Sequence, residues 1–349
     1  MNALIEKLAA GSDLNFGDIK YAVAVLLSEK TEDAKKAAFL SALHNKGETA
    51  EEVAIFVQHL IDRAVDPLLD AGKLPGPIID VCGTGGDGLD HFNVSTTIMF
   101  ILAAGGAVVV KHGNRGVTSL SGSADVLEAL GVRLDLQPEQ LRDCVQHTGL
   151  GFIFARQYHP AYRALAEMRT RLVTENQRTI FNLLGPLLNP ARPSRQLIGV
   201  YAPRLTTMFA EVLRQLGRDR AWIVHGLTPT GSGMDDISTS GATTLAELQD
   251  NKVSTGVIDA RWLGVPEAPM AELRGGDATE NAGILQGILS GEVTGAKSDL
   301  AVVNAAGGFV VAGLANDISD GIAQAREQIE SGRALGKLRA LQEFSAKSS

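Results

Sequence analysis

Cysteine is nearly absent from this chain of 349 residues, which holds only Cys82 and Cys144. Two cysteines at this separation have neither the spacing of a metal site nor the number of a disulfide framework. The sequence therefore excludes a small disulfide-stabilised secreted domain. We expect Cys82, on a predicted strand, to act as a small buried hydrophobic residue.

Long apolar runs are missing as well. The stretch from Ala301 to Ala312 is interrupted by Asn304 and by glycines, so it fits a buried helix better than a membrane span. The N-terminus shows neither the basic segment nor the continuous apolar segment of a secretory signal. We therefore expect a cytoplasmic protein without a membrane partner.

Positive charge is in short supply, with 32 Lys and Arg residues against 40 Asp and Glu residues and a formal net charge of −8. Binding to a nucleic-acid backbone needs a concentrated basic field, so we expect no nucleic-acid partner. Lys111, Arg115 and Arg133 still provide local positive charge for phosphorylated small molecules. With 45% hydrophobic residues, the chain can bury the cores of one large domain and a smaller companion.

Glycine is concentrated in a turn that follows the predicted strand Ile78 to Val81. The turn reads Gly83-Thr84-Gly85-Gly86-Asp87-Gly88, and Asn93-Val94-Ser95-Thr96 then opens an apolar helix. Glycine lets the backbone approach a ligand closely, and the first N–H groups of a helix attract anions. The spacing matches neither the dinucleotide motif nor the P-loop motif. The turn predicts a phosphate site, with a purely structural tight turn as the alternative.

A second polar loop follows the next predicted strand and strengthens the phosphate interpretation. After Val108 to Val110 the chain reads Lys111-His112-Gly113-Asn114-Arg115, and Ser121-Gly122-Ser123-Ala124-Asp125 opens another helix. Both loops fall at the carboxyl ends of strands, where parallel sheets bind their ligands. Two such loops in succession favour a phosphate-rich ligand over two structural turns.

Asp235 and Asp236 follow the glycine-rich segment Gly231 to Gly233, after another predicted strand. Mg²⁺ takes oxygen ligands and completes its shell with water and substrate phosphate, so one or two carboxylates beside a phosphate site suffice. The pair predicts a magnesium site, with an acidic surface turn as the alternative.

Strands and helices alternate over most of the chain. Such alternation with short connections predicts an α/β fold, a mostly parallel sheet with flanking helices, and the residues before it predict a smaller all-helical domain. In the helical part, Thr31 and Thr49 are candidate N-caps and Gly47 separates two helices. The predicted strands span residues 78–81, 107–111, 151–154, 197–201, 221–225 and 253–258. The predicted helices of the α/β part span residues 95–104, 123–130, 138–147, 206–216, 280–289 and 299–314, with a last one from Ser319.

Several stretches of this sequence resemble anthranilate phosphoribosyltransferase, and the similarity runs in order through nearly the whole chain. They are the turn 83–88, the residues 93–96, the loop 111–115 with 121–125, and the run Arg178-Thr179-Ile180-Phe181-Asn182-Leu183-Leu184-Gly185-Pro186-Leu187 through Asn189-Pro190. The resemblance implies a fold like that of nucleoside phosphorylases and phosphoribosyltransferases. It also implies a helical domain of residues 1–68 joined by 160–188, and an α/β domain of residues 69–159 and 189–349.

A reaction is implied by the same resemblance. The phosphoribosyl group of 5-phosphoribosyl 1-diphosphate would pass to the amine of anthranilate, in L-tryptophan biosynthesis, with Mg²⁺ as cofactor. An aryl amine is already a nucleophile, so positioning and charge stabilisation suffice and no general base is expected. The alternatives are a pyrimidine-nucleoside phosphorylase and a non-catalytic relative that binds nucleic acid. The resemblance further suggests a homodimer formed through the N-terminal helices.

Site residues carry over position by position from the resemblance. The transition state would be held by Lys111 and Asn114. The phosphoribosyl diphosphate would be bound by Gly83, Gly86, Asp87, His91, Asn93, Val94, Ser95, Thr96, Lys111, His112, Gly113, Asn114, Arg115, Gly116, Val117, Thr118, Ser119 and Ser123. The anthranilate would be bound by Gly83, Asn114, His159 and Arg169, with His112 beside its path. The metal would be held by Ser95, Asp235 and Asp236.

The chain departs from the family's pattern at several places. Its second acidic residue is Asp236 where the family has Glu, which shortens the reach of that carboxylate. His91 stands where the family has a small polar residue, and it is either a donor to phosphate or an exposed loop histidine. Residues 170–177 exceed the family's spacing, so the anthranilate arginine is Arg169 when counted forward and Arg171 when counted backward.

Overall fold

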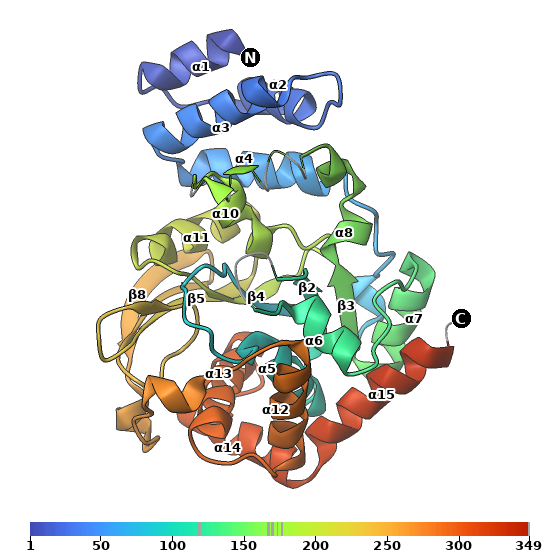
Figure 1. The fold of residues 1–349 in the computed structure, drawn as a ribbon. Coiled ribbons are helices and arrows are strands. Elements are labelled where there is room, and N and C mark those ends of the chain that lie inside the picture. The colour runs from blue at the N-terminus through green and yellow to red at the C-terminus, as the bar shows by residue number, and fades with distance from the viewer. Residues whose placement is uncertain (117–119, 166–167, 169–170, 173, 176, 348–349) are drawn as a thin grey trace.

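The molecule consists of a stack of N-terminal helices above a sheet covered by helices (Figure 1). The structure, a computed structural model, describes residues 1–116, 120–165, 168, 171–172, 174–175 and 177–347. Within these residues, no helix combines the length and the apolar character needed to cross a membrane. The N-terminal helices are α1 (Asn2–Ala9), α2 (Phe16–Leu26), α3 (Asp33–Lys46) and α4 (Ala50–Ile61).

Local sequence signals determine where these helices begin and end. Thr49 caps α4 as predicted: its hydroxyl accepts a hydrogen bond from the Glu52 N–H at 3.2 Å, and the Thr49 N–H donates to the Glu52 carboxylate at 2.9 Å. The prediction of Thr31 as an N-cap is wrong, because α3 has Glu32 at its cap position and no capping bond from a side chain. Gly47 ends α3 with a φ of 89°, a conformation that suits glycine.

In the described part of the chain, eight strands form one sheet with the order β3-β2-β1-β4-β5-β7-β8, and β6 pairs with β5. The pairs from β3 to β5 are parallel, whereas β5-β6, β5-β7 and β7-β8 are antiparallel. The predicted α/β fold with a mostly parallel sheet is therefore confirmed. The strands are β1 (Ile78–Gly83), β2 (Val108–Gly113), β3 (Leu150–Phe154), β4 (Arg195–Gly199), β5 (Arg220–Leu227), β6 (Gly233–Met234), β7 (Thr243–Gln249) and β8 (Lys252–Ile258).

Helices cover both faces of the sheet. α5 (Val94–Ala104) and α13 (Ala296–Ala312) pack on one face, and α11 (Arg204–Gln215) packs on the other, next to α4. Side chains of β5 alternate between the two faces of the sheet. Trp222 belongs to the hydrophobic core on the α13 face, and Ile223 belongs to the core on the α11 face. The other described α-helices are α6 (Ser123–Ala129), α7 (Pro138–Thr148), α8 (Ala155–Tyr158), α10 (Phe181–Leu184), α12 (Ala278–Ser290), α14 (Ile318–Glu330) and α15 (Arg333–Lys347). Short 3₁₀ helices span Ala71–Lys73, Pro160–Leu165, Gly185–Leu187, Ala260–Leu263 and Met270–Leu273.

The structure differs from the sequence prediction at strands β6 and β7, which the prediction lacks, and at the last helix. Strand β7 is absent from the sequence prediction, although Asp250 and Asn251, both at positive φ, form the two-residue turn that joins it to β8. The last predicted helix, from Ser319, is in fact two helices. Gly332, with a φ of 73°, separates α14 from α15.

Two hydrophobic cores lie on the two faces of the sheet. The core on the α11 face also contains residues of α1 to α4 and, from the later segment, Leu165, Met168, Leu172 and Ile180. The segment after β3 thus packs with the N-terminal helices, far from it in sequence. The domain boundaries themselves, 1–68 with 160–188 and 69–159 with 189–349, stay predictions.

Candidate active site

The turn after β1 takes the left-handed backbone conformation that its glycines permit. β1 ends at Gly83, and Gly85, Gly86 and Gly88 have φ values of 68°, 80° and 72°. A residue with a side chain would be strained at each of the latter three positions. The turn therefore needs glycine for its shape, and it leads to the start of α5.

The acidic segment after β6 packs directly on this turn. The Gly85 N–H donates to Asp235 Oδ2 at 2.6 Å, although the two residues are 150 positions apart. A Cβ atom at Gly83 would lie 2.5 Å from the same oxygen, so glycine allows the carboxylate to approach. The structure brings together the glycine turn and the acidic pair that the sequence predicted separately.

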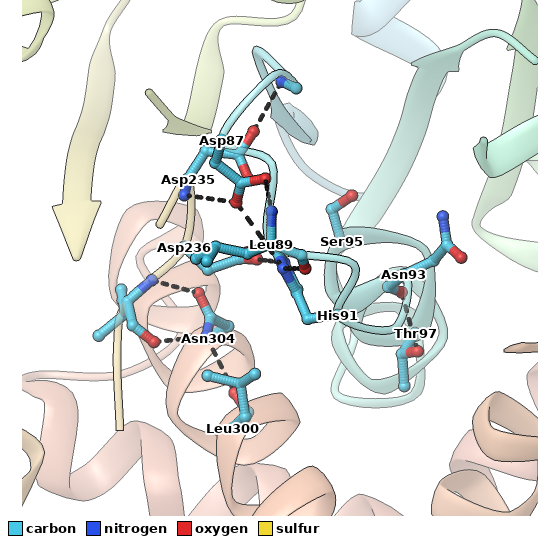
Figure 2. A network of polar contacts seen from close by, with 12 residues as sticks. Asp87, Leu89, His91, Asn93, Ser95, Thr97, Asp235, Asp236, Leu300 and Asn304 are labelled. Carbon is cyan, nitrogen blue, oxygen red and sulfur yellow. Dashed lines mark hydrogen bonds and ion pairs between the residues drawn. The ribbon is translucent and has the colours of Figure 1, made fainter. Parts of the chain in front are cut away.

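Three carboxylates and one imidazole meet beside the turn (Figure 2). His91 Nε2 lies 2.9 Å from Asp236 Oδ2, and His91 Nδ1 lies 3.7 Å from Asp87 Oδ2. One ligand atom from each of Asp87, His91 and Asp235 can be chosen so that all lie within 4.8 Å of one another. The His91 side chain is only 11% exposed, so the interpretation of His91 as an exposed loop histidine is wrong.

Hydrogen bonding defines the protonation state of His91. Its Nδ1 faces the Leu89 carbonyl oxygen at 3.1 Å and its Nε2 faces the Asp236 carboxylate at 2.9 Å, so both ring nitrogens donate. Burial alone would lower the pKa of His91, but the hydrogen bond and charge of Asp236, with the charges of Asp87 and Asp235, raise it to about 10. His91 is thus an imidazolium that compensates part of the carboxylate charge.

Burial and mutual repulsion raise the pKa values of two carboxyl groups in this cluster. Burial, together with the charges of Asp87 and Asp236, raises the pKa of Asp235 to about 8. Burial also raises the pKa of Asp236, against the hydrogen bond from His91. At neutral pH Asp235 therefore holds a proton, and a cation that displaces this proton would have three carboxylates as ligands.

A hard divalent cation fits this donor set. Carboxylate oxygens are the ligands that Mg²⁺ prefers, and the ion commonly keeps water and phosphate oxygens in its remaining positions. Asp87, Asp235 and Asp236 present such oxygens together, and Ser95 lies across from them in the first turn of α5 (Figure 2). Asp87 is the member that the sequence prediction assigned to the sugar diphosphate and not to metal.

Lys111 lies at the carboxyl end of β2 with only 1% of its surface exposed. Its ammonium donates to the Val81 carbonyl oxygen and to Ser95 Oγ, the latter at 3.1 Å, which holds it between β1 and α5. Burial lowers the pKa of Lys111, against the nearby acidic groups that raise it. A buried ammonium beside the N-terminus of a helix provides strong attraction for an anion.

The start of α5 contributes to the same edge. Asn93 occupies the N-cap position, but its side chain makes no capping bond to the helix and contacts Ser121 instead. Thr96 is fully buried, and its hydroxyl has no hydrogen-bond partner among the described residues. The first turn of such a helix offers backbone N–H groups to an anion.

The second polar loop is held by its own ion pairs. The Arg115 guanidinium donates to Asp125 at 3.0 Å and to Glu128 at 2.7 Å, and the Gly116 N–H donates to Asp125 at 2.8 Å. The Arg115 side chain is therefore engaged with α6, and its contact with the sugar diphosphate stays a prediction. The predicted residues that lie outside the described part of the chain are Val117, Thr118 and Ser119.

A buried pair of histidines joins β2 to the segment after β3. The rings of His112 and His159 have centroids 5.3 Å apart and planes at 72°. His159 Nε2 lies 2.9 Å from the Leu188 carbonyl oxygen, whereas His112 Nε2 has no partner within the described residues. Burial lowers the pKa of His112 to about 3 and that of His159 to about 4, so both rings are neutral. Neutral rings suit packing against an aromatic ligand.

Arg169 and Arg171 are the two candidates for binding the anthranilate carboxylate. Arg169 lies outside the described residues. Arg171 is half exposed, and its Nε lies 4.0 Å from Glu175 Oε1. The assignment of Arg169 therefore stays a prediction.

Two buried asparagines that the sequence prediction left without a site role support this edge of the sheet. Asn304, in α13, accepts a hydrogen bond from the Ile237 N–H at 2.8 Å and donates to the Ile237 carbonyl oxygen at 2.9 Å. This contact fixes the backbone directly after Asp236 (Figure 2). Asn281, in α12, bonds to Asn93 at 2.9 Å. A single amide inside an apolar helical run, as at Asn304, is the signal that sequence reasoning could have used.

Replacing Gly199 with Ala should destabilise the protein, because a Cβ atom there would lie 1.5 Å from the Asp235 carbonyl oxygen. We expect the free energy of unfolding to fall by about 1 to 3 kcal/mol, the usual cost of inserting an atom into a packed region. Gly336→Ala is the matched control, since nothing lies within 4 Å of a Cβ at that position in α15. It should stabilise by up to about 1 kcal/mol. Urea unfolding measures both, and equal effects would refute the close approach at Gly199.

Two family models match the chain. The model described as "Glycosyl transferase family, a/b domain" matches residues 75–335, and that described as "Glycosyl transferase family, helical bundle domain" matches residues 2–64. Together they cover the helical part and the sheet with its flanking helices.

Individual proteins are similar over nearly the full length. The anthranilate phosphoribosyltransferase of Desulfatibacillum aliphaticivorans is 44% identical over 341 residues, which cover 98% of this chain and 97% of that one. The crystal structure of the anthranilate phosphoribosyltransferase of Thermus thermophilus has a TM-score of 0.89 at 34% identity, covering 98% of this chain and 99% of that one. The enzyme of the same name from Saccharomyces cerevisiae, in complex with PRPP and Mg, has a TM-score of 0.85 at 26% identity, covering 99% and 97%.

Proposed function

This chain belongs to the anthranilate phosphoribosyltransferase family, and from that premise we propose that it transfers the phosphoribosyl group of 5-phosphoribosyl 1-diphosphate to the amine of anthranilate. The products are N-(5-phosphoribosyl)anthranilate and diphosphate, and the step belongs to L-tryptophan biosynthesis. The reaction breaks the bond between ribose C1 and the diphosphate oxygen and forms one between C1 and the anthranilate nitrogen.

The observation that carries this proposal is the convergence of anion donors and carboxylates at one edge of the sheet. The glycine turn contacts Asp235 through the Gly85 N–H at 2.6 Å, while Lys111 contacts Ser95 at 3.1 Å in the adjacent helix. A sugar diphosphate needs both features, because its phosphate oxygens bind N–H groups and ammonium groups while a metal neutralises the leaving diphosphate.

Mg²⁺ is the cofactor that we propose for this site. Asp235, Asp236 and Ser95 would hold it, with Asp87 as a further oxygen donor beside them. When bound, the ion supplies positive charge that stabilises the departing diphosphate. The Asp236 carboxylate is held at 2.9 Å by His91, so this shorter side chain has a defined position.

The chain itself contributes positioning and electrostatic stabilisation. Lys111 and the first turn of α5 would bind phosphate oxygens, and Lys111 with Asn114 would stabilise the transition state. His112 and His159 are neutral and buried, which suits them to line the anthranilate side. No general base is required, because the aryl amine attacks with its own lone pair and releases its proton afterwards.

The test is an assay of the purified protein with 5-phosphoribosyl 1-diphosphate, Mg²⁺ and anthranilate. We expect the fluorescence of anthranilate to fall with time, and to persist when Mg²⁺ is removed by EDTA. Thymidine with phosphate tests the phosphorylase alternative, and a gel shift at low salt tests nucleic-acid binding. Persistent anthranilate fluorescence at every substrate concentration would reject the proposed function.

A homodimer formed through the N-terminal helices is a further part of the proposal. Phe16 and Tyr21, both on α2, are 55% and 52% exposed, which is unusual for large apolar side chains and leaves an apolar surface for a partner. Light scattering of the purified protein should give twice the mass of one chain. The cytoplasmic location stays a prediction.

A further inference from the structure

Asn281, in α12, bonds to both phosphate loops at once. Its Nδ2 lies within hydrogen-bond distance of three acceptors, which its two N–H groups share: Asn93 Oδ1 at 2.9 Å, Ser121 Oγ at 2.8 Å and the Gly276 carbonyl oxygen at 3.0 Å. Its Oδ1 accepts a hydrogen bond from the Gly276 N–H at 3.0 Å. The residue is only 3% exposed, so water does not easily replace these partners.

Asn93 and Ser121 also bond to each other. The Asn93 Nδ2 donates to the Ser121 carbonyl oxygen at 3.3 Å, and Ser121 Oγ donates to Asn93 Oδ1 at 3.2 Å. Asn93 immediately precedes the first turn of α5, and Ser121 lies just before α6. One network therefore joins the loop after β1, the loop after β2 and the start of α12.

The segment that leads into α12 packs along the first loop. The Gly275 N–H donates to the Asp90 carbonyl oxygen at 2.9 Å, and His91 forms an isolated β-bridge with Arg274. A Cβ atom at Gly275 would lie 2.8 Å from the backbone of Phe92, so glycine allows this close contact. Asn281 also holds this segment in place, through its two hydrogen bonds with the backbone of Gly276.

We propose that Asn281 is a positioning residue for the phosphoribosyl diphosphate site. It holds Asn93 and Ser121 in one arrangement, so that the first turn of α5 and the start of α6 face the ligand together. Asn281 acts through Asn93 and does not contact the reacting atoms. The inference rests on the proposed function, because it concerns the same ligand.

Asn281→Asp removes the donor group of this network. The substitution keeps the shape of the side chain and its acceptor for the Gly276 N–H, but it removes the donor to Asn93, to Ser121 and to the Gly276 carbonyl oxygen. Carboxylate and carbonyl oxygens would then face each other, which forces the two loops apart. Thr206→Val is the control, because it likewise removes a side-chain donor from a buried residue: the Thr206 hydroxyl in α11 donates to the Pro203 carbonyl oxygen at 2.9 Å.

Calorimetric titration with 5-phosphoribosyl 1-diphosphate in Mg²⁺ measures the effect directly. We expect the Kd of Asn281→Asp to rise about 10- to 100-fold, the loss expected when supporting groups no longer hold a site in place. The KM for the sugar diphosphate should rise in proportion, whereas the KM for anthranilate should change less than about twofold. Thr206→Val should bind like the wild type. Asn281→Ser, which retains one donor, should recover part of the affinity and replaces the Asp variant if that variant does not fold.

Distinct outcomes separate the inference from the function on which it rests. A wild-type protein that does not bind the sugar diphosphate rejects the proposed function. Wild-type binding with unchanged affinity in Asn281→Asp overturns the inference alone. The double variant Asn281→Asp with Asn93→Ala should show a smaller rise in Kd than the product of the two single-variant rises, because both substitutions break the same network. If the two rises in Kd multiply fully in the double variant, Asn281 does not act through Asn93.

Discussion

Asp235→Asn should remove most of the activity and at the same time make the metal-free protein more stable. Asp235 Oδ2 accepts the Gly85 N–H at 2.6 Å and shares a small buried volume with Asp87 and Asp236. Loss of a metal ligand should weaken Mg²⁺ binding at least about 10- to 100-fold and lower kcat/KM by about 100-fold or more. An amide still accepts from Gly85 but no longer repels the neighbouring carboxylates, so the fold gains stability.

The gain in stability should depend on pH. The pKa of Asp235 is about 8 in the folded protein against an ordinary value of 3.8, so protonation of Asp235 favours the folded state. This contribution to the free energy of unfolding is complete below pH 3.8 and is lost as the pH rises through 8. The neutral amide of Asp235→Asn is insensitive to pH. Its advantage in the free energy of unfolding should therefore be near zero at about pH 4 and reach about 1 to 3 kcal/mol above about pH 8. Urea unfolding in EDTA measures this difference.

Asp259→Asn provides the opposite control. Hydrogen bonds from Arg261 lower the pKa of Asp259, so removing this carboxylate should cost stability and leave Mg²⁺ binding unchanged. Asp235→Asn would contradict the account if it bound Mg²⁺ normally by calorimetry. A loss of stability in that variant near pH 9 would show that the carboxylates do not repel one another in the native protein.

Lys111→Met should leave the fold intact and raise the KM for 5-phosphoribosyl 1-diphosphate by about 10- to 150-fold, since a hydrogen bond to a charged group contributes about 1.5 to 3 kcal/mol. Met fills most of the volume of the lysine stem, which matters because Lys111 is only 1% exposed. Burial already lowers the pKa of Lys111, so its replacement removes a costly buried charge and stability should change little. The KM for anthranilate should stay within about twofold.

Lys337→Met is the matched control for Lys111→Met. Lys337 is partly buried and, like Lys111, donates to a carbonyl oxygen, that of Thr148, which precedes β3 at the opposite end of the sheet from the site. Steady-state kinetics of both variants should show the defect in Lys111→Met alone. Equal KM values for the sugar diphosphate in the wild type and Lys111→Met would remove Lys111 from the site.

Features whose cause is local could be predicted from the sequence. The glycine turn 83–88 follows from backbone conformations that only glycine adopts readily, and its left-handed glycines are observed. Thr49 follows from a capping box of neighbouring residues. The α/β fold follows from alternating strands and helices, because parallel strands require crossover connections. In each case the partners that determine the structure are close in sequence.

Features that depend on distant partners were not predicted. His91 and Asp236 are 145 positions apart, and the sequence offered no means to see that an imidazolium would hold the shortened carboxylate. Asn281 and Asn93 are 188 positions apart, and neither residue type signals the contact. Strand β7 was missed because its pairing with β5 was not visible in its own residues. Tertiary packing decides all three.

A crystal structure with 5-phosphoribosyl 1-diphosphate and Mn²⁺, located by its anomalous signal in place of Mg²⁺, tests the central claim most directly. We expect the diphosphate against the glycine turn and the start of α5, with Lys111 bonded to a phosphate oxygen and the metal coordinated by Asp235 or Asp236. A sugar diphosphate bound elsewhere, or a metal remote from both aspartates, would contradict the account.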